Sequence, residues 1–329
     1  MGRLAFIFRT DVHACDKDHR PASWKADYFG EITESLRQVG AMAKDHGAVA
    51  VIDGGDFFHK KAPTRNSHAL VEHTVQIHKA YPCPVWEVEG NHDITNNDLA
   101  SVEHQPLGVL YACGIFGQLR EQVFKDQGLQ VRVVGVPYDP KRKLEDLQAI
   151  KKQPGDTHLV AIVHSLAGLK PPASTEDFFG ESVFDYDDLA GIQDGPEAWC
   201  FGHWHKDQGI EEINGRQFIN HGSVSRGALV RENLERTPKV GLIEIDLDGL
   251  RASSLLLNVA PAEEVFDMER KERTDREGKE IEAFVTRLSE QLTVDPGASI
   301  EEAIGSIGFA MDIQTLAREY IERARAGIG

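Results

Sequence analysis

The chain has 329 residues, a formal net charge of −17, 41% hydrophobic residues and 27% charged residues, which is ordinary for a globular protein with its own core. The first apolar run, Leu4–Phe8, is too short to span a membrane or to form a signal-peptide core, and the four cysteines form no CxxC pair; we expect a chain of the reducing cytoplasm without membrane attachment, disulfide framework or zinc ribbon. The acidic balance argues against the basic surface that is typical of a DNA-binding domain.

Strand and helix patterns alternate from the N-terminus to Phe201. A helix is expected over Trp24–His46, and the next over Asn66–Ala80 with Thr64 or Asn66 as its cap. Compact apolar runs predict buried strands around these helices. The expected strands are Leu4–Phe8, Ala48–Ile52, Pro84–Val88, Val131–Val136, Leu159–Val163 and Trp199–Phe201.

Beyond Phe201 the pattern changes to strands without long helices between them. Asn214-Gly215 is a strong signal for a tight hairpin turn. The two parts together predict an α/β fold, a two-sheet β-sandwich flanked by helices, over residues 1–259. The expected later strands are Gly209–Ile213, Gln217–Ile219, Val240–Ile245 and Leu255–Val259.

A charged linker and a helical tail are expected at 260–329. Met268–Lys279 is highly charged, and two helices are predicted over Ile281–Leu292 and Ile300–Ala324, separated by Asp295-Pro296-Gly297. This short, mainly helical appendage could pack on its own core, act as a reduced capping domain or bind a partner, and the sequence leaves these alternatives open.

Polar clusters follow five of the expected strands, at the strand ends where α/β proteins place their sites. Nitrogen and oxygen ligands without cysteine suit a pair of Mn²⁺, Fe or Zn²⁺ ions. Such a pair activates water and neutralises a phosphoryl group during transfer. The clusters therefore predict a metal-dependent phosphoester hydrolase. Their candidate ligands are Asp11, His13, Asp56, Asn91, His164, His203 and His205.

The clusters differ in how specifically they point to metal chemistry. Gly90-Asn91-His92-Asp93 is the most specific, because an amide ligand is rare and His92 is free to act on a substrate. The pair Asp11 and His13 is weak alone, since strand ends often alternate in this way, and Gly54-Gly55-Asp56 could be a simple turn. A lone histidine such as His164 would ordinarily be a core residue, and only its position after a strand makes it a candidate metal ligand.

With these residues in view, the chain resembles the calcineurin-like metallophosphoesterase superfamily over its first three-quarters. The loop from Gly55 to Thr64 indicates the branch, because protein phosphatases follow Gly-Asp with an Asp-Arg pair and this chain has Phe-Phe-His and then Pro-Thr. That loop is similar to the DNA-repair nuclease branch, which comprises the meiotic recombination eleven nuclease of eukaryotes and archaea and the bacterial SbcD subunit. Gly90-Asn91-His92-Asp93 is also similar to that branch.

The resemblance implies a manganese-dependent DNA exonuclease and endonuclease of double-strand-break repair, with Mg²⁺, Fe or Zn²⁺ as alternative metals. A water activated by two metals would attack the phosphorus. His92 would stabilise the phosphoryl charge or protonate the leaving oxygen, His59 would seat the scissile phosphate, and Asp93 would orient His92. The implied ligands are Asp11, His13 and His205 for one ion, Asn91, His164 and His203 for the other, and Asp56 as the bridge.

The resemblance also implies partners: DNA ends, hairpins or single strands, an SMC-like ABC ATPase of the SbcC type, and a second copy of the chain. Two basic clusters adjoin the motif loops and could contact phosphate, although most such clusters are solvated surface charge: Lys60-Lys61 with Arg65, and Arg226 with Arg231 and Arg236. Packing beside Phe57 and Phe58 is an alternative role for His59. The alternative functions are a small-molecule phosphodiesterase or phosphatase and a non-catalytic scaffold for DNA or the ATPase.

Overall fold

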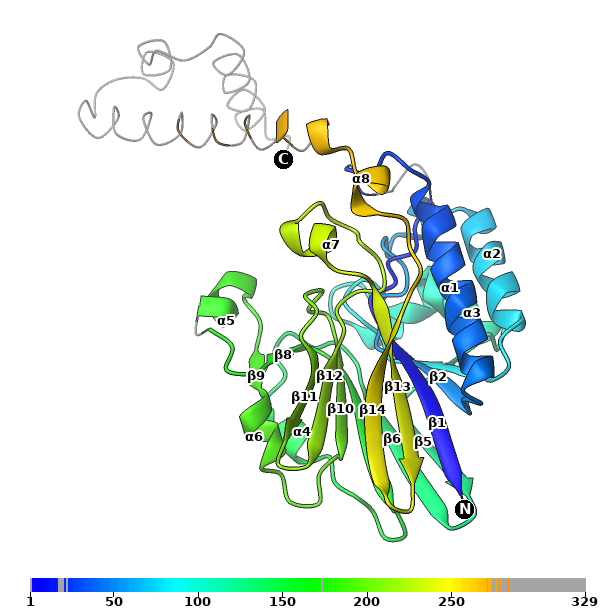
Figure 1. Cartoon of the computed structure of the whole chain (residues 1–329), viewed down its shortest axis with the longest axis vertical. Helices are drawn as coiled ribbons and strands as arrows, with labels where there is room; N and C mark the ends of the chain where they lie inside the picture. Colours follow the sequence, from blue (N-terminus) through cyan, green and yellow to red (C-terminus); the bar gives the residue numbers. More distant parts are fainter. Residues whose placement is uncertain are drawn as a thin grey trace, which may run out of the picture. The chain divides into compact units, whose positions relative to one another are not determined.

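Two six-stranded sheets form the centre of the fold (Figure 1). The computed structural model describes residues 2–16, 21, 23–172 and 174–270, and also residues 272, 273, 276, 279 and 283. The chain divides into two units, Met1–Phe266 and Asp267–Gly329. The predicted helices Ile281–Leu292 and Ile300–Ala324 lie outside the described residues.

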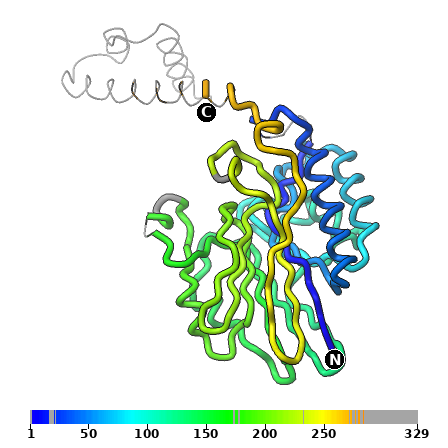
Figure 2. The backbone as a smooth tube through the Cα atoms, in the orientation of Figure 1, coloured from blue at the N-terminus to red at the C-terminus, as the bar shows by residue number. Residues whose placement is uncertain are grey.

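The first sheet has four parallel strands and an antiparallel hairpin at one edge. Figure 2 shows the N-terminal strand running beside that hairpin, where Arg3 pairs with Asp246. The strands lie in the order β14 (Gly249–Leu256), β13 (Lys239–Asp246), β1 (Arg3–Arg9), β2 (Ala50–Asp53), β3 (Val85–Glu87) and β4 (Phe116–Gln118).

The second sheet also has parallel strands at its centre, with antiparallel strands at both edges. A separate two-stranded sheet joins β8 (Leu166–Gly168) to β9 (Val183–Asp185). The strands of the second sheet lie in the order β11 (Gly209–Ile213), β12 (Arg216–Asn220), β10 (Ala198–Gly202), β7 (His158–His164), β6 (Leu129–Val136) and β5 (Glu121–Asp126).

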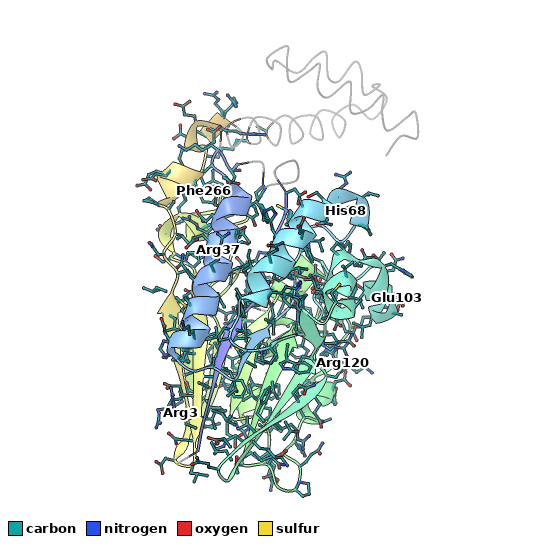
Figure 3. The ribbon with its side chains drawn as sticks, turned by 90° about the vertical axis from the view of Figure 1, so that its right-hand side faces the viewer. Arg3, Arg37, His68, Glu103, Arg120 and Phe266 are labelled. Atoms are coloured by element: carbon teal, nitrogen blue, oxygen red, sulfur yellow. The ribbon has the colours of Figure 1, made fainter. Side chains whose placement is uncertain are left out.

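Successive side chains of a strand point to opposite faces of its sheet and so belong to two different hydrophobic cores. Phe6 and Phe8 of β1 belong to the core between the sheets, whereas Ile7 belongs to the core shared with the helices on the outer face. Figure 3 shows the two longest helices of that outer face side by side, with Arg37 labelled on the first and His68 on the second. The longer helices of this face are α1 (Tyr28–Asp45), α2 (His68–Lys79) and α3 (Pro106–Ala112).

Shorter helices complete the first unit. The helix at Tyr186–Ala190 packs its buried Tyr186 and Leu189 with Trp199 and Phe218 of the second sheet. The remaining helices and 3₁₀ turns are α4 (Leu144–Gln148), α5 (Ser174–Phe179), α6 (Tyr186–Ala190), α7 (Arg231–Glu235), α8 (Ala262–Val265), η2 (Pro63–Arg65) and η3 (Leu99–His104).

The predicted fold class, a two-sheet sandwich flanked by helices, is confirmed, and so is the hairpin at Asn214-Gly215. The predicted caps of the second helix are wrong. Ser67, directly before the first residue of α2, caps the helix by accepting a hydrogen bond from the Leu70 amide, whereas the Asn66 side chain donates through Nδ2 to the Lys60 and Ala62 carbonyls.

Several element bounds also differ from the prediction, and the first helix begins at Tyr28 instead of Trp24. The last strand is not Leu255–Val259: β14 ends at Leu256, because it pairs with β13 in a hairpin whose register begins with Asp246 opposite Gly249. The C-terminal end of the first unit is held by Phe266, which packs edge-on against Trp24, and by the Lys25 amide, which donates to the Val265 carbonyl.

Candidate metal centre

The seven candidate ligands converge at one edge of the two sheets, although they come from five separate stretches of the chain. Asp11 and His13 follow β1, Asp56 follows β2, and Asn91 follows β3. His164 is the last residue of β7, and the pair around Trp204 follows β10. Parallel strands place their carboxyl ends at the same edge, so these loops meet in space.

One group consists of Asp11, His13, Asp56 and His205, whose nearest ligand atoms all lie within 4.8 Å of one another. The Nε2 atoms of His13 and His205 are 2.8 Å apart, and the His205 Nε2 is 3.4 Å from Asp11 Oδ1. The His13 Nε2 is 3.8 Å from Asp56 Oδ2. Four ligand atoms thus face one point.

A second group consists of Asp56, His164 and His203, again with ligand atoms within 4.8 Å of one another. The His164 Nε2 lies 3.6 Å from Asp56 Oδ2 and 3.3 Å from Asn91 Oδ1. Asp56 therefore belongs to both groups, and Asn91 adjoins the second.

The backbone of the site is held in an uncommon conformation. Asp11, His13, Asp56 and His203 have φ angles of 52°, 48°, 58° and 86°, in the left-handed region that non-glycine residues rarely adopt. The Asp11 amide donates to the Gly55 carbonyl at 2.9 Å and the His13 amide to the Asp56 carbonyl at 3.0 Å. These bonds maintain a strained geometry of the kind that clusters at functional sites.

Glycine is required where the loops touch. A Cβ on Gly90 would collide with the Asp56 carboxylate, and one on Gly55 (φ +101°) would lie 2.6 Å from His164 Nδ1. Both positions therefore admit only glycine without displacing a candidate ligand.

The electrostatics of the two groups favour a cation. Burial alone would raise the pKa of Asp11 and Asp56, but His205 near Asp11 and His164 near Asp56 outweigh it, and both carboxylates have a lowered pKa. Burial together with His205 lowers the pKa of His13 well below its ordinary value. Charged carboxylates and a neutral imidazole are the forms that bind metal ions. The same carboxylates outweigh burial and raise the pKa of His164 to about 9 and also raise the pKa of His205, so a cation bound there would displace a proton from these two rings.

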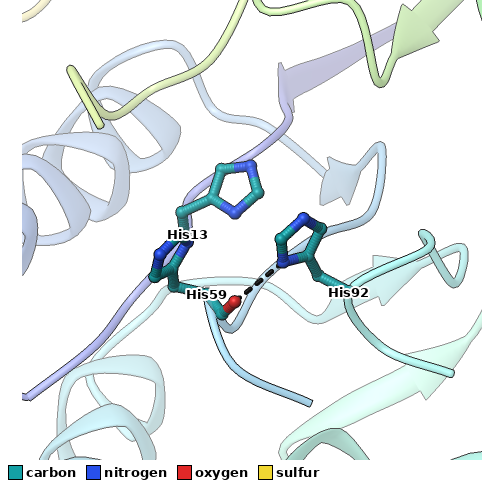
Figure 4. A group of neighbouring side chains, drawn as sticks. All are labelled: His13, His59 and His92. Carbon is teal, nitrogen blue, oxygen red and sulfur yellow. Dashed lines mark hydrogen bonds between the residues drawn. The ribbon is translucent and has the colours of Figure 1, made fainter. Parts of the chain in front are cut away.

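His92 and His59 lie at the mouth of the first group, where the rings of His13, His59 and His92 point toward one another (Figure 4). The His92 Nδ1 is 2.7 Å from the His59 carbonyl oxygen, and the His92 amide donates to Asp56 Oδ1 at 2.7 Å. Burial and the nearby Lys60 lower the pKa of His59 to about 4. Both histidines thus lie beside the candidate ligands.

Asp93 does not orient His92 as expected. Its Oδ2 instead accepts hydrogen bonds from the amides of Asp56 at 2.8 Å and Gly90 at 2.9 Å. The carboxylate therefore ties the loop after β2 to the loop after β3, and the His59 carbonyl is the group that orients the His92 ring.

Two residues beside the site were missed by the sequence interpretation. Glu181 Oε2 lies 2.8 Å from His203 Nε2, and Glu181 Oε1 accepts a hydrogen bond from the Tyr138 hydroxyl at 2.7 Å. Tyr138 comes just after β6, so the strand-end rule could have identified it. No sequence signal marks Glu181, because it lies in the segment between α5 and β9.

A cleft of about 700 Å³ opens onto the candidate ligands. Phe179 and Val230 form apolar parts of its wall and remain 43% and 44% exposed. The Phe179 ring packs edge-on against Trp204, with ring centroids 6.5 Å apart. The lining residues are Asp56, Asn91, His92, Phe179, His203, Trp204, His205, Lys206, Ala228, Val230 and Asn233.

Two members of the basic cluster after β12, Arg226 and Arg236, make structural contacts, contrary to the phosphate role considered from the sequence, whereas the Arg231 side chain is 85% exposed. Arg226 is 3% exposed, pairs with Glu31 at 2.7 Å and lies over the Trp24 ring. Arg236 donates hydrogen bonds to Ser223 and Ser225.

Among the residues that the structure describes, no helix is both long and apolar enough to cross a bilayer.

Comparison with known proteins places the chain in a family. Residues 4–207 match the family model of the calcineurin-like phosphoesterases. The chain is 26% identical, over 98% of its length and 72% of the relative's, to the DNA double-strand break repair protein Mre11 of Archaeoglobus fulgidus. This similarity supports the predicted branch.

Solved structures that resemble this chain have low sequence identity to it. A protein from Staphylococcus aureus described as a candidate 5′-nucleotidase has a TM-score of 0.50 and 16% identity over 80% of this chain. This chain spans 55% of that protein's length. The calcineurin-like phosphoesterase YfkN of Bacillus subtilis has a TM-score of 0.49 and 13% identity, with 79% of this chain and 92% of that one covered.

Proposed function

Because the chain belongs to the calcineurin-like phosphoesterase family, we propose that it is a DNA exonuclease and endonuclease that uses two divalent cations. The observation that carries this proposal is the position of Asp56, which belongs to both groups of ligand atoms. A shared carboxylate between two clusters is the arrangement that a pair of ions requires. Asp11, His13 and His205 would hold one ion, and Asn91, His164 and His203 the other.

The donor set fits divalent cations. It contains imidazole nitrogens and carboxylate and amide oxygens but no thiolate, which suits Mn²⁺ and related ions. The two Nε2 atoms of His13 and His205, 2.8 Å apart, both face Asp11, which is the geometry of two ligands around one cation. Manganese is our proposal for the natural ion.

Bound ions would polarise the phosphoryl oxygens and make a water nucleophilic near neutral pH. The chain's own contribution is centred on His92. Its Nδ1–H donates to the His59 carbonyl, which leaves Nε2 as the atom available to a substrate. In the protonated form, Nε2–H would donate to a phosphoryl or leaving oxygen as negative charge develops there. His59, whose ring lies 5.7 Å from the His92 ring, would help to seat the phosphate.

The wall of the cleft supports a nucleic acid as substrate. Phe179 and Trp204 offer aromatic surface next to Lys206, and aromatic stacking beside a cation is how proteins bind single strands. Similarity to the Archaeoglobus repair protein also supports DNA. From the same similarity we propose that the chain works as a dimer with an SMC-like ABC ATPase in double-strand-break repair.

The decisive experiment is a nuclease assay on linear, hairpin and circular DNA with Mn²⁺ or Mg²⁺, with and without a coiled-coil ATPase from the same genome. We expect Mn²⁺-dependent degradation of linear or hairpin DNA. Hydrolysis of bis-p-nitrophenyl phosphate without any cleavage of DNA, even with the ATPase, would overturn the DNA assignment in favour of a small-molecule phosphodiesterase. Intact binding of DNA without hydrolysis of either substrate would favour a scaffold.

A further inference from the structure

Glu181 connects a segment outside the motif loops to one of the candidate ligands. It lies between α5 and β9, in the stretch that leaves the second sheet after β7. Its Oε2 is 2.8 Å from the Nε2 of His203, whereas its Oε1 accepts the Tyr138 hydroxyl at 2.7 Å. Both carboxylate oxygens are therefore engaged, and the side chain is only 20% exposed.

Tyr138 fixes the position of this carboxylate. The Tyr138 residue is 7% exposed, and its amide donates to the Glu89 carbonyl at 2.8 Å. Its ring centroid lies 5.2 Å from that of His203 and 6.1 Å from that of His164. The tyrosine therefore packs on both histidines of the second group while its hydroxyl directs Glu181 toward one of them.

The contact with Glu181 also decides which nitrogen of His203 is available. A carboxylate can only accept a hydrogen bond, so Nε2 must carry the proton in the Glu181–His203 pair. The remaining nitrogen, Nδ1, then has the lone pair. His164 follows the same logic, because its Nδ1 lies 2.6 Å from the Gly54 carbonyl and its Nε2 lies near Asp56.

We propose that Glu181 is a positioning residue for the second cation: it holds the His203 ring in the tautomer that presents Nδ1 to the site. This inference rests on the two-cation function proposed above. A carboxylate on the distal nitrogen of a metal-binding histidine fixes the orientation of the ring and raises its basicity. Since Asp11, His13 and His205 form the other group, the effect of Glu181 should be confined to one of the two binding events.

The test is a titration of the full chain with Mn²⁺ by isothermal calorimetry. We expect Glu181→Gln and Glu181→Ala to weaken one of two binding steps by about 10- to 100-fold and to leave the other unchanged. Glu181→Asp should restore part of the affinity, and Tyr138→Phe should have a smaller effect. Glu176→Gln is the matched control, because it removes the same charge from an exposed position in the adjoining helix α5.

A second measurement separates positioning from a loss of folding. Imidazole ¹⁵N spectra of the metal-free protein should show His203 protonated on Nε2 in the wild type, and Glu181→Ala should lose this preference while its thermal unfolding stays cooperative. Equal Mn²⁺ affinity and an unchanged His203 tautomer in both Glu181→Gln and Glu181→Ala would overturn the inference. Failure of the wild type to bind any divalent cation would instead overturn the proposed function.

Discussion

The carbonyl oxygen of His59 holds the imidazole of His92 through Nδ1 at 2.7 Å, and the two rings lie nearly parallel, with an interplanar angle of 18°. The His92 amide is bound in turn to Asp56, the carboxylate that both ligand groups share. The ring that would meet the substrate is therefore connected directly to the residue that would bridge the cations.

This connection predicts that His92 serves the chemical step rather than metal binding. His92→Gln should lower kcat by about 10²- to 10⁴-fold, the usual contribution of a positioned acid or base. The Mn²⁺ affinity measured by calorimetry should stay unchanged. His59→Ala keeps the backbone carbonyl that orients His92, so its loss in kcat should be smaller. A kcat of His92→Gln equal to that of the wild type would contradict the assigned role.

Replacement of ligands should abolish cation binding as well as catalysis. Asn91→Ala combined with His164→Ala removes two donors from the second group, and Asp56→Asn weakens both groups. We expect losses in activity beyond about 100-fold, larger than the effect of a residue that only supports a ligand. Circular dichroism should show a folded chain. DNA cleavage that persists in the double variant would refute the ligand assignment.

The aromatic wall predicts a substrate-specific effect. Phe179→Ala removes a stacking surface, which is typically worth about 1 to 3 kcal/mol per base. The KM for oligothymidylate should therefore rise roughly 5- to 150-fold, whereas hydrolysis of an abasic oligonucleotide should change little. Leu247→Ala, at an exposed residue of the β13–β14 turn, is the control. Equal effects on both substrates would show that Phe179 does not contact bases.

A buried ion pair beneath the site should govern stability. Arg9 Nε lies 2.6 Å from Asp53 Oδ2 with both side chains fully buried, and Asp53 Oδ1 accepts the Gly55 amide at 3.2 Å. Arg9→Met leaves the buried Asp53 carboxylate without its charged partner and should lower the free energy of unfolding by about 3 to 5 kcal/mol. Arg37→Met breaks an exposed pair and should cost under about 1 kcal/mol.

Denaturant unfolding would measure both values. Addition of Asp53→Asn to Arg9→Met should recover part of the stability, because the uncompensated charge is then gone. A loss for Arg9→Met no greater than that for Arg37→Met would contradict the importance of the buried pair.

The lowered pKa of the buried His221 makes the stability of the fold depend on pH. Burial, followed by the nearby Lys239, lowers the pKa of His221 to about 4 from an ordinary 6.5. The unfolded chain therefore binds this proton more readily than the folded chain does. The contribution to stability is complete above pH 6.5 and is lost as the pH falls toward 4, by about 3 kcal/mol in total.

Denaturant unfolding between pH 8 and pH 4 would test this dependence. The slope of unfolding free energy against pH should decrease in His221→Gln, which cannot take up the proton. The same slope in both proteins would assign the pH dependence to other groups.

Local sequence was sufficient for the layered fold and for the candidate residues. The apolar run Leu4–Phe8 and the later runs of the same type became strands because continuous apolar sequence is stable only when both faces are buried. The candidate polar clusters could then be identified by their position at the ends of these runs, since Asp11 and Asn91 each come just after such a run. Turn chemistry likewise identified the hairpin at Asn214-Gly215.

Only the tertiary structure decided how these residues act on one another. Asp93 accepts hydrogen bonds from the Asp56 and Gly90 amides and does not contact His92 in this way, and Glu181 pairs with His203 from a segment with no motif. Such pairings depend on loop geometry and on which strands become neighbours, whereas local pattern reports only burial and backbone preference. The sequence by itself therefore determined which side chains gather at the strand ends, and three-dimensional packing decided their partners.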